Sequence, residues 1–349
     1  MTATGTPAGA RTKRWLVQGT LLLVAIGLLA WTVWGNRDQI QQVIASKPDP
    51  RRLGLAFLLY MLGMCVTFLR WHQLVRALGL PFRLADAFRL GLIGNVFNLV
   101  IPGAVGGDLI KAAFLCREQA KKTQAVASMV IDRGVGLLGL FLLAGVAGLF
   151  ELPNAVPQVR GLIGMAWLAV LAGVVGLAVL FTPALYRPLL RLVAGKGRLE
   201  AVAQEFIELA SLYRERLGVV VLALALSVLG HLLFVLAFTV VDQALFPATA
   251  PSLARHLVIT PLVLFTTAVP LPMGALGLTE KASEAIFKLI DFPGGAVAMM
   301  GYRVLMYVGG LLCALVYLAN AAQVRALRHD AEELETELEQ GDLGQPGVG

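Results

Sequence analysis

The sequence is poor in the residues that soluble domains, disulfide frameworks and metal enzymes require. Charged residues make up 15% of the 349 positions, where soluble domains carry about a quarter. The three cysteines lie in or beside apolar segments without paired spacing: Cys65, Cys116 and Cys313. This spacing argues against a disulfide framework and a cysteine-based metal site. The four histidines are too few for a histidine-rich metal site.

Nucleotide-binding and zinc-protease motifs are also missing. The sequence contains no GxxxxGK[ST] phosphate loop, no GxGxxG after a strand and no HExxH. We therefore expect no cofactor, no metal and no ATP hydrolysis within the chain, and we predict that it is not an enzyme. His231 and His256 are expected to be satisfied helix or interface residues rather than proton carriers.

Apolar residues dominate what is present. They make up 58% of the chain, and the mean hydropathy is +0.77, as in integral membrane proteins. Six apolar stretches have spanning length: 15–34, 53–69, 126–150, 161–181, 217–241 and 296–319. Shorter or broken stretches occur at 87–101 with 109–115, and at 256–271 with 282–290. We predict an all-α polytopic membrane protein with about six full spans and two re-entrant hairpins.

The positive charge of +7 lies mainly in short loops, where Lys and Arg set topology and contact anionic headgroups. No nucleic-acid partner is expected. Four segments give the topology: 151–160 and 242–255 have one basic residue each, whereas 70–89 has four and 186–216 has six. The positive-inside rule places the segments that are rich in Lys and Arg, and both termini, in the cytoplasm. The first span is expected to remain uncleaved. Segment 35–52, with four basic residues on the outside, conflicts with the positive-inside rule.

This orientation predicts two inverted repeats. Residues 84–119 must enter and return at the cytoplasmic face, and residues 256–291 at the outer face. The expected repeats are 53–150 and 217–319, within one transmembrane domain covering 1–323. An amphipathic surface helix is predicted at 198–216, and an acidic cytoplasmic tail at 324–349.

Each predicted hairpin contains a proline-glycine break inside apolar sequence. The break residues are Pro102, Gly103 and Gly107 in the first hairpin, and Pro272, Gly274 and Gly277 in the second. At an offset of 170 residues Pro102 matches Pro272, and the same offset pairs Lys111 with Lys281 and Arg133 with Arg303. The acids Asp108 and Glu280 do not coincide at this offset. Broken backbone at membrane depth is tolerated only where protein buries it or where it lines a cavity.

Several interpretations of these residues stay open. The glycines of the first break either expose N–H groups to a phosphate or form a tight turn. Asp132 and Arg133 are adjacent on a helix and cannot face each other, so each needs another partner, for which the hairpin charges are candidates. Arg133 either snorkels to the headgroups or, as we favour, faces the interior. The interior charges form either a structural network or an anion site.

An ordered set of motifs resembles one family. The run Asn95-x-x-Asn98-x-x-x-Pro102-Gly103-x-x-Gly106-Gly107-Asp108-x-x-Lys111 resembles the first signature of the lysylphosphatidylglycerol synthase transmembrane (flippase-like) family. The later segments Asp132-Arg133, Pro270–Glu280 and Tyr302-Arg303 resemble its later signatures, and Arg70-Trp71 its early hairpin-entry segment. The resemblance covers about 53–322. It implies a bacterial-type membrane domain that moves lipids or lipid-linked precursors between leaflets, without the cytosolic synthase of two-domain members.

The sequence therefore predicts a flippase of the bacterial cytoplasmic membrane. Arg133, Arg303 and Lys111 are predicted to hold the headgroup phosphate. The other candidate site residues are the counter-charges Asp108, Asp132 and Glu280, together with Asn95, Asn98 and Tyr302. Expected partners are membrane lipids, and a second copy or a separate synthase. The alternatives are an enzyme acting on a polyprenyl or glycolipid phosphate, and a scaffold for a synthase.

Overall fold

The computed structural model describes residues 8–100, 106–117, 122–153, 155–193 and 213–321 apart from 269–271, with isolated positions between 195 and 211. Every regular element in these ranges is helical. The helices are α1 (Ala8–Gly35), α2 (Arg37–Ser46), α3 (Pro50–Ala77), α4 (Leu84–Val100), α5 (Gly106–Arg117), α6 (Lys122–Glu151), α7 (Pro157–Phe181), α8 (Pro183–Val193), α10 (Leu217–Leu245), α11 (Leu253–Phe265), the 3₁₀ turn η1 (Thr266–Ala268), α12 (Pro272–Ala275), α13 (Leu278–Lys288) and α14 (Gly295–Ala319).

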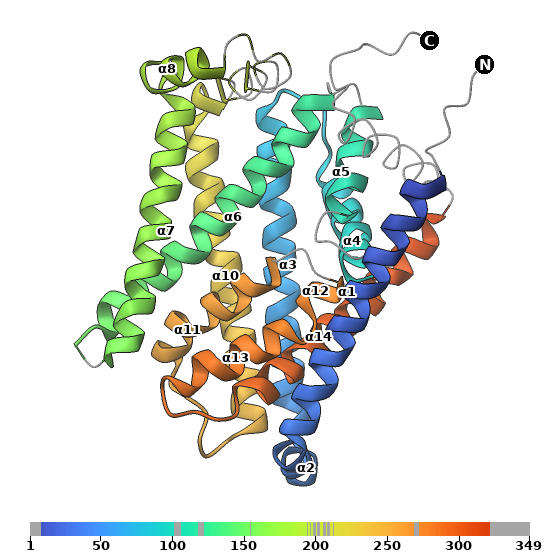
Figure 1. Ribbon diagram of the computed structural model, residues 1–349, viewed down its shortest axis with the longest axis vertical. Helices are drawn as coiled ribbons and strands as arrows, with labels where there is room; N and C mark the ends of the chain where they lie inside the picture. Colours follow the sequence, from blue (N-terminus) through green and yellow to red (C-terminus); the bar gives the residue numbers. More distant parts are fainter. Residues whose placement is uncertain are drawn as a thin grey trace.

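Five helices of the described ranges are long and apolar enough to cross a membrane: α3, α6 from Ser128, α7, α10 and α14. The described part of α1 adds the shorter apolar stretch Leu23–Gly35. The predicted all-α polytopic membrane fold is thus confirmed. We call the end of the bundle that carries α8 in Figure 1 the upper end, and the end that carries α2 the lower end.

The two hairpins occupy opposite halves of the bundle (Figure 1). Helices α4 and α5 lie in the upper half, and α3 delivers the chain to α4 at the upper end. Helices α11, α12 and α13 lie in the lower half, where α10 delivers the chain to α11. Each hairpin therefore enters the bundle from its own end, as the loop charges predict. Which end faces the cytoplasm stays a prediction.

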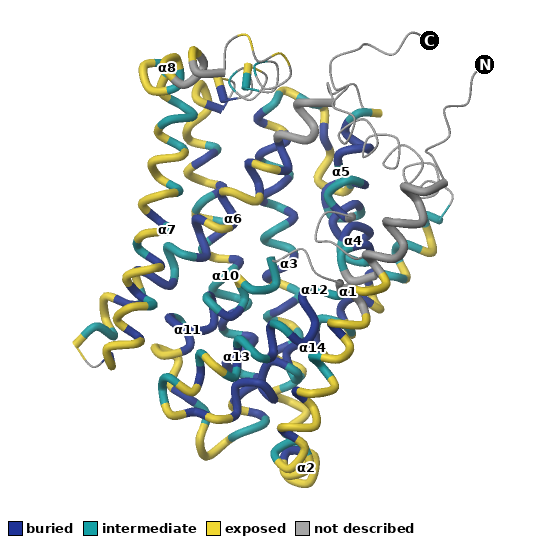
Figure 2. Tube along the Cα trace, in the orientation of Figure 1, coloured by how far each residue is buried: buried dark blue, intermediate teal, exposed yellow. Residues whose placement is uncertain are grey.

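Small residues let the central helix α10 approach its neighbours closely. A Cβ on Gly139 of α6 would lie 2.4 Å from Ser227 Oγ, and a Cβ on Gly63 of α3 would lie 2.6 Å from a ring carbon of Phe234. Transmembrane helices associate through such contacts because lipid offers no hydrophobic drive between them. The peripheral helix α7 buries a single narrow stripe, Val159, Ile163, Ala166 and Val170. Its other apolar faces are exposed (Figure 2), as lipid contact requires.

Two segments that were predicted as loops are largely helical. Within 70–89, helix α3 continues to Ala77 and α4 starts at Leu84, so Arg70 is a buried helical residue rather than a loop charge. Within 242–255, helix α10 continues to Leu245, so Asp242 is helical and buried as well. The predicted spans 53–69 and 217–241 end just before the first charged residue, Arg70 and Asp242 respectively. The helices continue because each charge meets a partner from another helix.

About half of the predicted amphipathic helix at 198–216, and all of the tail at 324–349, lie outside the described residues. Tyr213 is described, and its buried hydroxyl donates a hydrogen bond of 3.0 Å to the carbonyl oxygen of Leu74 in α3. Burial raises the pKa of Tyr213 above its ordinary value, so the hydroxyl keeps the proton that it donates.

Candidate functional site

The first hairpin carries a cluster of two cations around one carboxylate. Asp108 is the third residue of α5, and its Oδ2 accepts a hydrogen bond of 2.5 Å from Arg133 Nε of α6. Lys111 Nζ lies 3.6 Å from Asp108 Oδ1 and 5.0 Å from the centre of the Trp71 ring. The Asp108 and Lys111 side chains are 14% and 12% exposed, whereas Arg133 is 43% exposed. We call Asp108, Lys111 and Arg133 the first-hairpin cluster.

The second hairpin carries a buried pair instead. Glu280 is the third residue of α13, and its Oε1 accepts a hydrogen bond from Arg303 Nε of α14. The other carboxylate oxygen accepts 2.7 Å from the Gly277 N–H. Arg303 also donates to the carbonyl oxygens of Met273 (2.8 Å) and Gly274 (3.2 Å). At 4% and 0% side-chain exposure, Arg303 and Glu280 satisfy the broken backbone and each other.

The two acid–arginine pairs are structurally equivalent although their acids do not align at the offset of 170 residues. Each acid is the third residue of the second hairpin helix, and each arginine lies on the long helix that follows. Helix α13 starts 172 positions after α5, so the segment before it absorbs the difference of two residues. The mismatch of Asp108 and Glu280 is therefore one of sequence position, because both acids occupy the same place in their hairpins.

Asp132 has a partner that the sequence argument did not assign. Its two carboxylate oxygens accept hydrogen bonds from Arg70 Nε (2.8 Å) and Nη2 (3.0 Å), and Arg70 Nη1 donates to Ser227 Oγ (3.1 Å). Arg70 and Asp132 are both buried. The charged residues of the hairpins were the expected partners of both Asp132 and Arg133. For Asp132 this prediction is wrong. The available signal was Arg70 itself, an ionisable residue next to an apolar run.

The remaining candidate residues brace the helices. The Gly107 N–H donates to Asn98 Oδ1 at 3.0 Å, so that N–H is not free for a phosphate. Asn95 Nδ2 lies 3.6 Å from Cys313 Sγ of α14, and Tyr302 packs against the rings of Tyr60 and Phe238. The two asparagines thus bond a neighbouring helix and the freed backbone of the break, as polar residues in membrane helices commonly do.

The break glycines that the structure describes are required by close packing or by backbone conformation. A Cβ on Gly107 would lie 2.3 Å from the Gly94 carbonyl oxygen of α4. Gly274 and Gly277 have φ of +67° and +81°, and a Cβ on Gly277 would lie 2.5 Å from Leu28 Cβ of α1. Pro272 begins α12, and Pro102 and Gly103 lie outside the described residues.

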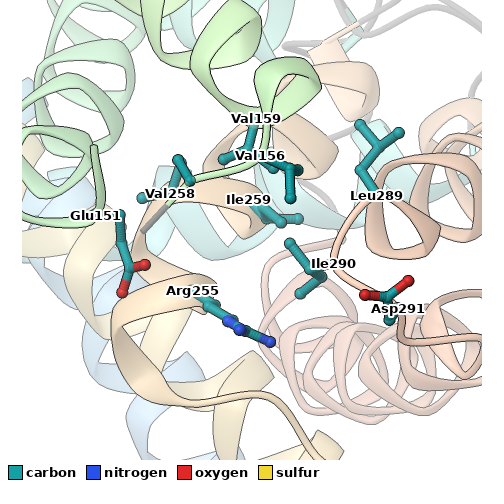
Figure 3. A pocket seen from close by; sticks show the side chains of 10 residues that line it. Glu151, Val156, Val159, Arg255, Val258, Ile259, Leu289, Ile290 and Asp291 are labelled. Atoms are coloured by element: carbon teal, nitrogen blue, oxygen red, sulfur yellow. The ribbon is translucent and has the colours of Figure 1, made fainter. Parts of the chain in front are cut away.

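A pocket of about 440 Å³ lies elsewhere, and none of the predicted site residues lines it (Figure 3). Its walls are Glu151, Ala155, Val156, Val159, Arg255, Val258, Ile259, Leu289, Ile290 and Asp291. It is therefore distinct from the first-hairpin cluster. Among the described residues, no group of His, Cys, Asp or Glu is arranged to hold a metal ion.

Comparison with known proteins places the chain in a family. The model of the family described as "Lysylphosphatidylglycerol synthase TM region" matches residues 19–314. The chain is similar to "UPF0104 membrane protein MJ1595" of Methanocaldococcus jannaschii, with 27% identity over 34% of this chain and 36% of that protein. It is also similar to "Glycosyltransferase AglD" of Haloferax volcanii, with 28% identity over 39% of this chain and 22% of that protein. The chain thus spans about a third or less of the length of each relative. The family match, in contrast, covers most of this chain. The chain belongs to the family of lysylphosphatidylglycerol synthase transmembrane regions.

Proposed function

We propose that the protein moves a lipid with a phosphate-bearing headgroup between membrane leaflets, and that the first-hairpin cluster holds the phosphate. The observation that carries this proposal is the 43% exposed side chain of Arg133, the sixth residue of the segment Ser128–Glu151 that is apolar enough to span a membrane. A guanidinium at this depth is costly unless it has a function or a partner. Asp108 supplies one carboxylate for both Arg133 and Lys111, so the three residues together carry one positive charge.

This charge balance favours an anionic ligand. A phosphate that approaches Arg133 and Lys111 replaces water around the exposed guanidinium and adds the second negative charge that the cluster accommodates. Arg offers two parallel N–H donors to phosphate, whereas Lys contributes a point charge. Asp108 keeps the two cations in position when the site is empty. The Arg303–Glu280 pair differs because it is buried and Arg303 holds the broken backbone of its own hairpin.

The proposal narrows the predicted site. Arg133, Lys111 and Asp108 remain as headgroup residues, whereas Arg303 and Glu280 hold the second hairpin in its broken conformation. Asp132 acts through Arg70 to fix α3 against α6. In keeping with the loop charges, we place the protein in the bacterial cytoplasmic membrane with both termini inside.

The test measures translocation in proteoliposomes. Fluorescent phosphatidylglycerol, phosphatidylethanolamine or polyprenyl phosphate is loaded, and a membrane-impermeant quencher reports transfer between leaflets. Arg133→Gln and Lys111→Gln should each lower the rate at least tenfold for the lipid that is moved. The exposed Arg51 at the start of α3 gives a matched control, because Arg51→Gln removes the same charge away from the cluster. Unchanged rates in both cluster variants for every lipid would refute the assignment.

A second function uses the same phosphate chemistry. One relative is named a glycosyltransferase, so the cluster is also compatible with holding a lipid-linked phosphate for an enzyme. The lipids recovered from the same proteoliposomes are analysed by mass spectrometry. A new product that depends on Arg133 would favour the enzyme, and translocation with unchanged lipid would favour the flippase.

A further inference from the structure

An acid and a histidine are fully buried against each other at the lower end. Asp242 lies three residues before the end of α10, and His256 is the fourth residue of α11. His256 Nε2 is 3.2 Å from Asp242 Oδ2, and neither side chain has any exposed surface. Nothing in the first-hairpin cluster uses this pair, and burial of two ionisable groups in a membrane helix bundle requires an explanation.

The surroundings of the pair are apolar. The His256 ring lies 5.8 Å from the Phe238 ring and 5.4 Å from the Phe287 ring of α13. His256 Nδ1 is 3.0 Å from Thr260 Oγ1. Among the described residues, neither carboxylate oxygen of Asp242 nor His256 Nε2 has a hydrogen-bond partner of good geometry, although the two groups lie within ion-pair distance. An unpaired carboxylate oxygen in such surroundings makes a bound proton favourable.

The helices packed around the pair carry other ionisable side chains, and several of these have partners of their own. Arg52 donates to the Gln243 carbonyl, Lys281 and Lys288 pair with Glu284, and Arg303 pairs with Glu280. Arg255 and Glu151 line the pocket of Figure 3. Tyr60 and Tyr302 are buried phenols, and Tyr302 packs on the Phe238 ring.

The buried pair is most favourable when it binds a single proton. With one proton shared between imidazole and carboxylate, the pair has no net charge, whether that proton sits on His256 or on Asp242. Adding or removing a proton leaves an uncompensated net charge in apolar surroundings, which is strongly unfavourable. A change in protonation therefore requires α10 and α11 to separate and admit water. Protonation and opening of the lower end are thereby linked.

The first repeat, residues 53–150, contains the same two residue types in exchanged order. At the offset of 170 residues, Asp242 corresponds to His72 and His256 corresponds to Asp86. These two residues lie near the end of α3 and the start of α4, at the upper end. Here the contact is not made. His72 Nε2 lies 3.2 Å from the Phe82 carbonyl oxygen, His72 Nδ1 is buried without a partner among the described residues, and Asp86 accepts 2.7 Å from Arg89.

We propose that Asp242 and His256 form a proton-binding site that holds the lower end closed, and that His72 and Asp86 form the equivalent contact at the upper end when the lower end opens. The site binds one proton in the closed state. In the open state both side chains are hydrated, and the pair can release that proton to water. Rising pH therefore favours opening. The proposal goes beyond lipid translocation, and the proton site is measurable without it.

The test follows the exposure of a buried position near Asp242. In full-length protein whose native cysteines are replaced by serine, Ala244→Cys places a thiol at a 4% exposed site of α10, and Ala248→Cys places one in the exposed loop that follows. Maleimide modification rates are measured in nanodiscs from pH 6 to pH 9. The ratio of the two rates cancels the titration of the thiol. It should rise about tenfold per pH unit above pH 7, as one released proton requires.

Two variants of the pair separate a proton site from a structural contact. The neutral combination Asp242→Asn with His256→Gln should make the rate ratio independent of pH. The exchanged combination Asp242→His with His256→Asp copies the order of the first repeat and should restore the pH dependence. A ratio that does not change with pH in the protein with its natural pair would overturn the proposal. So would an equal pH dependence in the neutral combination.

Discussion

The contrast between the Arg70–Asp132 and Arg133–Asp108 pairs yields a quantitative prediction about stability. Arg70 and Asp132 are joined by two hydrogen bonds of 2.8 and 3.0 Å, with side chains 8% and 12% exposed. Removing one partner of such a buried pair leaves an uncompensated charge and costs about 3–5 kcal/mol. Asp132→Asn should therefore shift the unfolding equilibrium by between about 100-fold and about 5,000-fold.

The matched comparison is Arg133→Gln, one residue further along the same helix. Arg133 is 43% exposed, so solvent screens its pair with Asp108 and the expected loss is at most about 1 kcal/mol. Both variants are unfolded by SDS titration in mixed micelles, and helicity is followed by circular dichroism. The combination Arg70→Met with Asp132→Leu should recover most of the loss, because it removes both buried charges.

Two results would refute this reasoning. If Asp132→Asn were no less stable than Arg133→Gln, burial would not be what distinguishes the two pairs. If the combination of Arg70→Met with Asp132→Leu were no more stable than Asp132→Asn alone, the loss would not arise from an uncompensated buried charge. Either outcome would remove the argument that Asp132 is structural and Arg133 functional.

Three further predictions concern packing and topology. Gly277→Ala places a Cβ against α1 at positive φ and should cost about 1–3 kcal/mol in the same SDS titration, whereas Gly54→Ala on an open helix face should be neutral or stabilising. Tyr213→Phe leaves a backbone carbonyl of α3 unpaired and should cost about 1–3 kcal/mol, again by SDS titration. Cysteine labelling from outside whole cells should modify a thiol at Pro153 but not one at Gly195, and the reverse pattern would invert the predicted topology.

Much of the architecture follows from the sequence because its signals are local. Apolar runs of spanning length mark the helices, since each run must satisfy its own backbone in lipid. Proline and glycine mark the hairpin breaks for the same reason, and the described start of α12 at Pro272 agrees with this. The predicted helix ends were less accurate where a charge interrupts an apolar run. At Arg70 and Asp242 the charge is buried inside a continuing helix.

The identity of each charge's partner did not follow from the sequence. Adjacent Asp132 and Arg133 point in different directions, and the crossings of α6 with α3 and α5 decide which groups they meet. His256 was expected to be an ordinary interface residue. The structure places it against a second buried ionisable group, Asp242, which had been assigned to a loop.

By itself, the sequence determined that this chain is a helical membrane protein with two interrupted hairpins and with basic residues inside its apolar segments. These properties depend on hydropathy and on backbone hydrogen bonding within each segment. The tertiary structure alone decided that Arg303 caps a broken backbone, that Arg133 remains accessible, and that Asp242 meets His256. Partnerships of this kind depend on helix tilt and on small residues that permit close approach, and both arise only when the segments pack together.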